Sequence, residues 1–157
     1  MLKTFCIALL LLTSGNVYSQ TQFQKTYGFT SFVRVTGMQV TQTGGYALAA
    51  VMDYHSIILK LDWSGQVLFA KEIENIDTYN VESLELTDDG GFILCAANRE
   101  FPGSYDLHLL RMDSSGNVLW TKAFGGWGLD QGMIAKQTSD GGFIACGTNS
   151  DNAIRTY

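Results

Sequence analysis

The chain has 157 residues, with 15 Asp and Glu against 10 Lys and Arg, which gives a net charge of −5 with both His neutral. An acidic chain without a basic run has no electrostatic footprint for nucleic acid or an anionic lipid surface. Seventeen Gly, a single Pro and many β-branched and aromatic residues favour short strands joined by glycine turns. We therefore expect an all-β protein that binds neither class of polyanion.

The N-terminus predicts a signal peptide over residues 1–19. Lys3 precedes an apolar run at residues 5–12, and Val17 and Ser19 are tolerated at positions −3 and −1 of a cleavage site before Gln20. The apolar run is shorter than the ~20 residues that span a bilayer. We expect export with cleavage, which leaves residues 20–157 as one domain without a membrane span.

Two sequence elements then recur. The first, TQTGGYALAA at residues 41–50, returns as TDDGGFILCA at 87–96 and as TSDGGFIACG at 138–147. The second, KLDWSGQVLFAK at residues 60–71, returns as RMDSSGNVLWTK at 111–122. We interpret the glycine pairs and the D-x-S-G runs as hairpin turns, because Gly adopts positive φ without a steric penalty and Asp accepts bonds from the following N–H groups.

The turn interpretation competes with a catalytic or calcium-binding one. Asp89 and Asp140 resemble a carboxylate motif, but Thr43 takes their place in the first copy. The D-x-S-G runs also lack the ligand count of an EF-hand-like calcium site. We therefore predict no catalytic residue, no metal ligand and no cofactor.

Each repeat predicts four strands, A to D. Strand A ends at the threonine of the first element, and strand B begins at its aromatic residue (Tyr46, Phe92 or Phe143). Strand C ends at the Asp of D-x-S-G, and strand D centres on Phe69 or Trp120. Four strands per 40–50 residues, repeated, are typical of β-propeller blades. We expect a partial β-propeller of about three four-stranded antiparallel blades at residues 36–73, 80–124 and 130–157, after a lone D strand at 22–28.

Two further expectations follow from the repeat. The second copy has a longer B–C segment, residues 97–107, which we interpret as a loop insertion. Cys95 and Cys146 hold equivalent positions in successive sheets about 10 Å apart, too far for a disulfide. We expect both to be buried free thiols.

Three blades are too few for a ring, which has four to eight. Open ends would expose several large apolar side chains, each worth ~1.5–3 kcal/mol when buried. Three alternatives stay open: a fragment of a larger ring, two copies that form a six-bladed ring by exchanging D strands, and a compact three-blade monomer.

The repeated pattern T-x-D-G-G-[FY] followed by [KR]-x-D-x-x-G-x-V-L-[WF]-x-K resembles tandem repeats of secreted propeller-like proteins of Gram-negative bacteria. The run MDSSGNVLW, residues 112–120, is also similar to the tryptophan-docking repeats of quinoprotein-type propellers. This resemblance implies that Trp120 wedges between blades, with Phe69 and Phe23 in the equivalent places. It also implies a secreted, periplasmic or cell-surface location in a Gram-negative bacterium.

The B–C and D–A connections differ at every occurrence, unlike the repeated turns. Irregular loops on a rigid scaffold are where binding usually occurs, and aromatic side chains mixed with charges suit sugar rings or protein hot spots. Such aromatic side chains can instead cover the blade ends, and we interpret His108 as an ordinary strand residue. The candidate ligand-binding residues are Tyr54, His55, Tyr79, Arg99, Glu100, Tyr105, Trp127 and Asp130.

Two function classes follow. The first is a secreted non-catalytic module that binds a glycan or a protein through these connections, or serves as an envelope scaffold. The second is a fragment of a propeller enzyme, either quinoprotein dehydrogenase-like or polysaccharide-degrading. A quinoprotein would need acidic and amide calcium ligands around a cofactor, and the sequence offers no such set, so we favour the binding module.

Overall fold

The computed structural model describes the backbone of residues 3–8, 24–29, 33–53, 55–73, 78–100, 104–125, 129–148 and 154–156. Every element within these ranges is a β strand, so the prediction of an all-β fold is confirmed. All strand pairs inside the sheets are antiparallel.

The strands form four sheets in chain order. The first sheet pairs β1 (Lys3–Ala8) with β2 (Gln24–Phe29). Blade 1 contains β3 (Val33–Val40), β4 (Tyr46–Met52), β5 (His55–Leu61) and β6 (Val67–Glu72). Blade 2 contains β7 (Thr78–Leu86), β8 (Phe92–Glu100), β9 (Ser104–Met112) and β10 (Val118–Phe124). Blade 3 contains β11 (Gln131–Gln137), β12 (Phe143–Thr148) and β13 (Ile154–Thr156).

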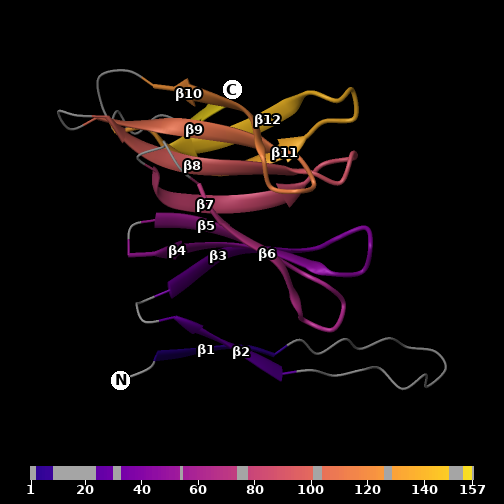
Figure 1. Cartoon of the computed structure of the whole chain (residues 1–157). Coiled ribbons are helices and arrows are strands. Elements are labelled where there is room, and N and C mark those ends of the chain that lie inside the picture. Colours follow the sequence, from indigo (N-terminus) through magenta and orange to yellow (C-terminus); the bar gives the residue numbers. More distant parts are fainter. Residues whose placement is uncertain are drawn as a thin grey trace.

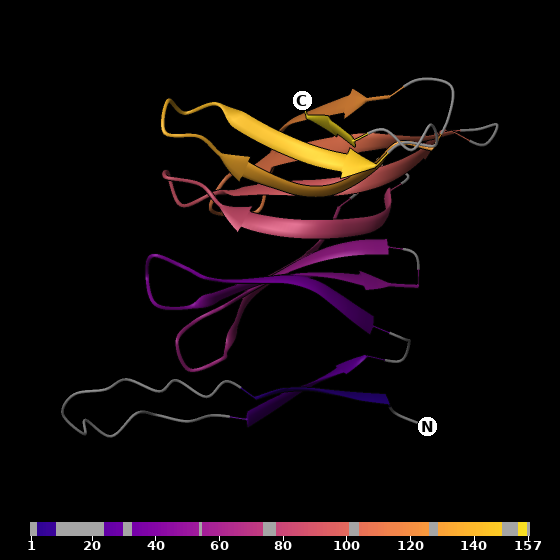
Figure 2. The same ribbon diagram turned by 180° about the vertical axis from the view of Figure 1, so that it is seen from behind.

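The sheets stack as layers, with the β1–β2 sheet at one end of the pile and blade 3 at the other (Figure 1). The view from behind shows the same order (Figure 2). Each four-stranded sheet is a meander in which sequential strands are neighbours. This is the arrangement of propeller blades, and the described residues do not close into a ring.

Local turn chemistry sets these boundaries. Strand B begins at the aromatic residue after each glycine pair, as predicted. The first glycine of each pair has a φ that only glycine adopts freely, +83° at Gly44, +78° at Gly90 and +83° at Gly141. The D-x-S-G glycines, Gly65 and Gly116, both have a φ of +77°. The prediction that both elements are hairpin turns is therefore confirmed.

The longer B–C segment of blade 2 is not the loop that we expected. Strands β8 and β9 each have nine residues, whereas β4 and β5 each have seven. Most of the insertion therefore lengthens the hairpin, with residues 98–100 and 104–106 paired across it. The prediction of a loop was wrong for a physical reason. Residues added in pairs to a hairpin form backbone hydrogen bonds with each other, whereas the residues of a loop would need other partners for the same groups.

Blade 2 is buried on both faces. Phe92, Leu94 and Ala96 of β8 pack with Ala47 and Ile58 of blade 1 in one cluster. The alternate β8 residues Ile93 and Cys95 pack with Ala135 and Ala145 of blade 3 in a second cluster. Successive side chains of a strand point to opposite faces, so a strand that is apolar throughout is covered on both sides by stacking.

Cys95 and Cys146 are free thiols, as expected. Cys95 is buried and Cys146 is half-buried, so full burial holds only for the first. Burial raises the pKa of the Cys95 thiol to about 12, and the nearby Cys146 adds to the shift. Cys95 therefore serves as a small apolar side chain between blades 2 and 3.

The predicted leader overlaps β1. In the structure of the whole chain, Lys3–Ala8 pairs with β2 from Lys3↔Phe29 to Ala8↔Gln24. Removal of residues 1–19 stays a prediction, and it would free this edge of β2.

Arg111 joins strand C of blade 2 to the turn between strands A and B. The side chain of Arg111 is 7% exposed, and its Nη2 lies 2.6 and 2.5 Å from the two carboxylate oxygens of Asp89. Its Nη1 donates to the carbonyls of Phe92 and Met112. Asp89 also accepts from Thr87 at 2.7 Å. These bonds to Thr87 and Arg111 lower the pKa of Asp89 to about 2.

The side chain of Asp89 is itself 62% exposed, so solvent screens the pair. We predict that Asp89→Asn lowers the free energy of unfolding by about 1 kcal/mol, because the buried guanidinium loses its charged partner. In the folded protein the pKa of Asp89 lies below its usual value. The contribution of the ionised carboxylate to the free energy of unfolding is therefore fully present above about pH 4. It is lost as the pH falls through about 2. Denaturant unfolding at several pH values measures this, and Asp88→Asn, an exposed neighbour, is the charge-matched control. Equal effects of the two substitutions would rule out a specific role for the Arg111 pair.

Candidate functional site

The stacked sheets present two opposite rims. The turn rim carries the A–B and C–D turns, residues 41–45, 62–66, 87–91, 113–117 and 138–142. The connection rim carries the B–C and D–A connections. In Figure 1 the turn rim lies on the right and the connection rim on the left. The sidedness follows from the meander, in which alternate turns fall on the same edge of each sheet.

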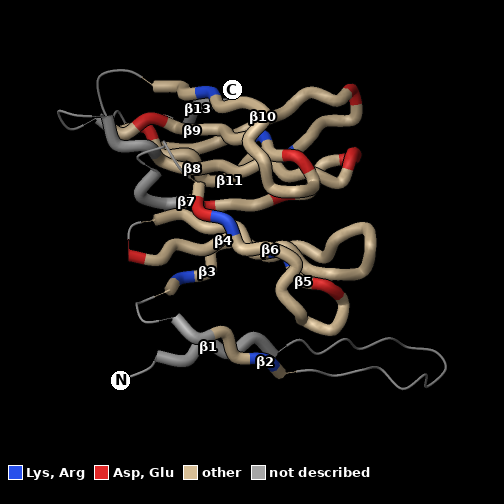
Figure 3. The backbone as a smooth tube through the Cα atoms, in the orientation of Figure 1, with Lys and Arg blue, Asp and Glu red and all other residues tan. Residues whose placement is uncertain are grey.

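Four aspartates of the turn rim, Asp62, Asp89, Asp113 and Asp140, accept hydrogen bonds from their own turns. Asp62 Oδ1 accepts from the Ser64 and Gln66 backbone nitrogens at 2.8 and 2.9 Å. Asp113 Oδ1 accepts from the backbone of Asn117 at 2.8 Å. These bonds hold the pKa of both carboxyls below the usual value. Figure 3 shows acidic positions at the tips of these turns. Their geometry is that of hairpin turns, as expected from the sequence.

The connection rim brings two distant segments together. The backbone N–H of Asp130, just before β11, donates to the carbonyl of Tyr105 on β9 at 2.5 Å. Leu129 forms a parallel bridge to Tyr105. Asp130 is buried, Tyr105 is half-buried and Leu129 is 46% exposed. The end of the D–A connection that leads into blade 3 thus meets the B–C hairpin of blade 2 at Tyr105, and this contact is here called the crossing.

Three more candidates belong to blade 2. Arg99 is the register partner of Tyr105, and Glu100 is the partner of Ser104. Tyr79 is the extra residue where the register shifts between Thr78 and Asn80. The backbone therefore gathers Tyr79, Arg99, Glu100, Tyr105 and Asp130 on the part of the rim formed by blades 2 and 3.

His55 lies on blade 1, apart from that group. Its Nδ1 is 2.6 Å from Glu72 Oε1, and the two side chains are 60% and 49% exposed. An exposed pair of this kind contributes little to stability. Because both side chains are largely exposed, both are accessible to a ligand. Tyr54 and Trp127 lie outside the described residues.

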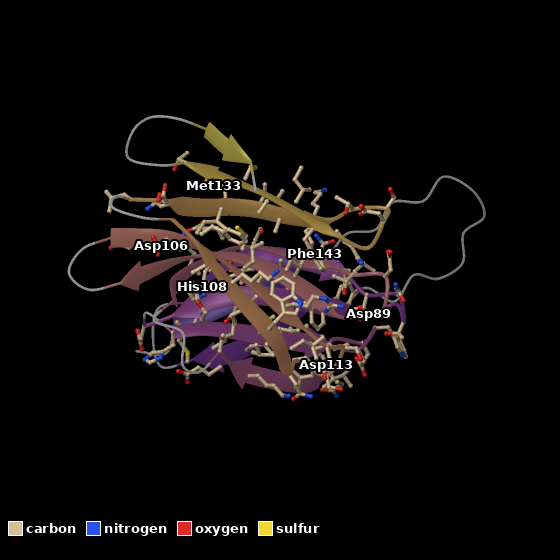
Figure 4. All side chains as sticks on the ribbon, turned by 90° about the horizontal axis from the view of Figure 1, so that it is seen from above. Asp89, Asp106, His108, Asp113, Met133 and Phe143 are labelled. Atoms are coloured by element: carbon tan, nitrogen blue, oxygen red, sulfur yellow. The ribbon has the colours of Figure 1, made fainter. Side chains whose placement is uncertain are left out.

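Asp106 and His108 follow Tyr105 along β9 at alternate positions. His108 is buried, and its strand partners are Ala96 and Ala123. Figure 4, seen from the blade 3 end, places Asp106 and His108 away from the turn aspartates Asp89 and Asp113. Among the described residues no group of three or more His, Cys, Asp or Glu is arranged to hold a metal ion.

Sequence reasoning missed two features. The Asp89–Arg111 pair was missed, although the recurrence of Lys60 and Arg111 before D-x-S-G was a usable signal. Trp63 was also passed over, since the turn rim was treated as wholly structural. Trp63 is 62% exposed, and Ser114 takes its place in the next repeat.

Comparison with known proteins identifies the fold alone. No protein-family model matches the chain, and no curated protein matches it significantly. The chain is similar to a protein of unknown function from Bacteroides caccae, known from a 1.35 Å crystal structure. The TM-score is 0.53 at 14% sequence identity, over 85% of this chain and 49% of the other. The chain therefore spans about half the length of that protein.

In the part of the chain that the structure describes, no helix has the length and apolar character needed to cross a membrane.

Proposed function

We propose that the protein is an exported, non-catalytic repeat module that binds a glycan or a protein through its connection rim. The observation that carries this proposal is the crossing at Tyr105, where the Asp130 N–H bond and the Leu129 bridge join two connections of different blades. A binding site needs side chains held by a rigid scaffold. The crossing supplies a half-buried aromatic ring beside an exposed leucine, with Arg99 on the neighbouring strand.

The contrast between the two rims supports the same proposal. On the turn rim, Asp62, Asp89, Asp113 and Asp140 accept hydrogen bonds from their own turns. These bonds repeat from blade to blade, which is the behaviour of structural turns. On the connection rim the side chains differ between blades. A ligand bound there would therefore contact a combination of side chains that is not repeated from blade to blade.

The proposal extends to location and to the ends of the stack. The leader sequence supports export to the periplasm or the cell surface of a Gram-negative bacterium. The outer faces of the stack support association with further blades of a longer chain or with a second copy. N-terminal sequencing of the exported protein should give Gln20 as the first residue, and a product that retains Lys3 would contradict the export proposal.

The binding proposal predicts that Tyr105→Ala weakens binding of a glycan or protein ligand about tenfold or more, as expected for an aromatic hot spot. A glycan array with the exported protein identifies a ligand, and calorimetry then measures its affinity. Trp63→Ala, which removes an exposed aromatic ring from the turn rim, is the matched control and should leave the affinity unchanged.

Two outcomes would contradict this function. Equal losses of affinity in both variants would place the site away from the connection rim. Binding of pyrroloquinoline quinone with calcium, together with oxidation of a substrate coupled to a dye, would favour the propeller-enzyme alternative. Thermal unfolding of both variants shows whether Tyr105→Ala acts through stability instead.

A further inference from the structure

Asp130 places a buried carboxylate at the crossing. The residue is 7% exposed, and its backbone N–H donates to the Tyr105 carbonyl at 2.5 Å. Within the described part of the chain, no hydrogen bond or ion pair reaches its side chain. The crossing therefore holds an acidic group whose charge the described residues do not balance.

Arg111 shows how a buried charge is otherwise treated in this protein. It is the other buried Asp, Glu, Lys or Arg among the described residues. Its guanidinium is paired with the Asp89 carboxylate and donates to two backbone carbonyls. Such pairing is usual, because burial removes the solvation of an ionised group and a partner must replace it. Asp130 departs from this pattern, and a departure of this kind calls for an explanation.

The repeated fold does not require an acidic residue at this place. Asp130 lies eight residues before Thr138, which ends strand A, and the same position holds Val33 in blade 1 and Tyr79 in blade 2. Strand A forms in both of those blades without a carboxylate there. The acidic group is therefore a feature of the crossing and not of every blade.

The Asp130 carboxylate can be reached from outside. Within the described residues, no side-chain oxygen of Asp130 is both sealed from solvent and without a partner, so its unpartnered oxygens touch the surface. Leu129, the residue before it, is 46% exposed and bridges to the half-buried Tyr105. An incoming group would therefore meet a carboxylate beside an apolar and an aromatic side chain.

The neighbouring acidic residue, Asp106, is packed differently. A Cβ atom at Gly125 would overlap the Asp106 carboxylate, so the chain just after β10 lies against it. The described residues of the crossing thus present the single accessible carboxylate of Asp130. A metal ion is held by three or more ligands, whereas one carboxylate suits an organic cation that brings its own hydrogen-bond donors.

We propose, on the basis of the binding function above, that the crossing binds a protein which inserts an arginine side chain beside Tyr105, with its guanidinium paired to Asp130. A guanidinium donates two parallel hydrogen bonds to a carboxylate and also stacks on aromatic rings. Its charge balances that of Asp130, which the neutral hydroxyl groups of a sugar do not. The net charge of −5 also favours the approach of a basic partner.

Two short peptides test the cation directly. Blocked Gly-Arg-Gly and the same peptide with citrulline in place of arginine have nearly the same shape, but citrulline is uncharged. NMR titration of the exported protein with the arginine peptide should shift the backbone amides of Tyr105 and Asp130. The affinity of the arginine peptide should exceed that of the citrulline peptide about tenfold, because hydrogen bonds between charged groups are stronger than those with a neutral donor.

Asp130→Asn removes the charge but keeps the shape of the side chain and the backbone bond to Tyr105. This variant should lose about tenfold in affinity for the arginine peptide and should bind both peptides equally. Asp88→Asn, which removes an exposed charge from the turn rim, is the matched control and should keep the preference of the parent. Both substitutions change the net charge by one, so the comparison separates a local pair from the effect of net charge.

Urea unfolding distinguishes a ligand-binding carboxylate from a structural one. Asp130→Asn should leave the urea midpoint unchanged or raise it, because the folded state then no longer buries an unpaired charge. A lowered midpoint would mean that the carboxylate is paired within the chain, for example by Arg99 on the strand beside Tyr105. That result would overturn the proposal.

Three binding results would also overturn it: equal affinities of the two peptides for the parent, equal losses in the two Asn variants, or amide shifts confined to the turn rim. A neutral glycan that binds the parent and Asp130→Asn equally, but binds Tyr105→Ala weakly, would keep the connection rim as the binding site and show that its ligand is not cationic. If Tyr105→Ala left the affinity for every ligand unchanged, the proposed function itself would be contradicted.

Discussion

Phe92→Ala is expected to lower the free energy of unfolding by about 3–5 kcal/mol, the usual cost of removing a buried aromatic ring. Phe92 begins strand B of blade 2, is 0% exposed, and packs in the cluster that joins blades 1 and 2. The cavity would lie between two sheets whose backbones are fixed by their own hydrogen bonds, so little collapse can fill it. Urea unfolding followed by tryptophan fluorescence measures the loss.

Phe143→Ala is the matched control, since Phe143 has the same place in blade 3. Phe143 is half-buried and packs edge-on against Trp120 with the ring centres 5.5 Å apart. Its loss should therefore cost roughly half as much, in proportion to the area that it buries. If Phe143→Ala proved as costly as Phe92→Ala, the stacking of blade 2 between two neighbours would not be the source of the difference.

The hairpins could be predicted because their causes are local. A positive φ at Gly90 and an Asx turn at Asp62 each depend on a few adjacent residues. The starts of strands β4, β8 and β12 follow directly from these turns. Self-similarity then extended each local inference to every copy, and the layered all-β architecture followed from strands that are apolar on both faces.

The remaining features depend on contacts between distant residues. The length of the β8–β9 hairpin is set by cross-strand pairing, which residue types at 97–107 do not encode. The crossing at Tyr105 requires a connection 24 residues further along the chain. Arg111 meets Asp89 across 22 residues. The sequence therefore located the connection rim as a region of variable loops but could not show which of its residues meet.

The second large effect on the free energy of unfolding is expected at the glycine pairs. The two glycines of a pair are required for different reasons. At Gly91 a Cβ atom would overlap the carbonyl of Met112 and the guanidinium of Arg111. A backbone carbonyl cannot rotate away, so Gly91→Ala should cost about 3 kcal/mol, the upper end for overpacking. Gly45 meets the carbonyl of Leu61 in the same way, so blades 1 and 2 share this requirement.

Gly90 is required for its backbone angle alone. Its φ is +78°, and the nearest atoms to an added Cβ, from Gln42 and Ser114, lie 3.9 and 4.0 Å away. Asn tolerates this conformation, so Gly90→Asn should cost less than about 1 kcal/mol. The same urea unfolding compares the two variants. A larger loss at Gly90 than at Gly91 would mean that the turn angle, and not the close approach of strands A–B and C, makes the glycine pair necessary.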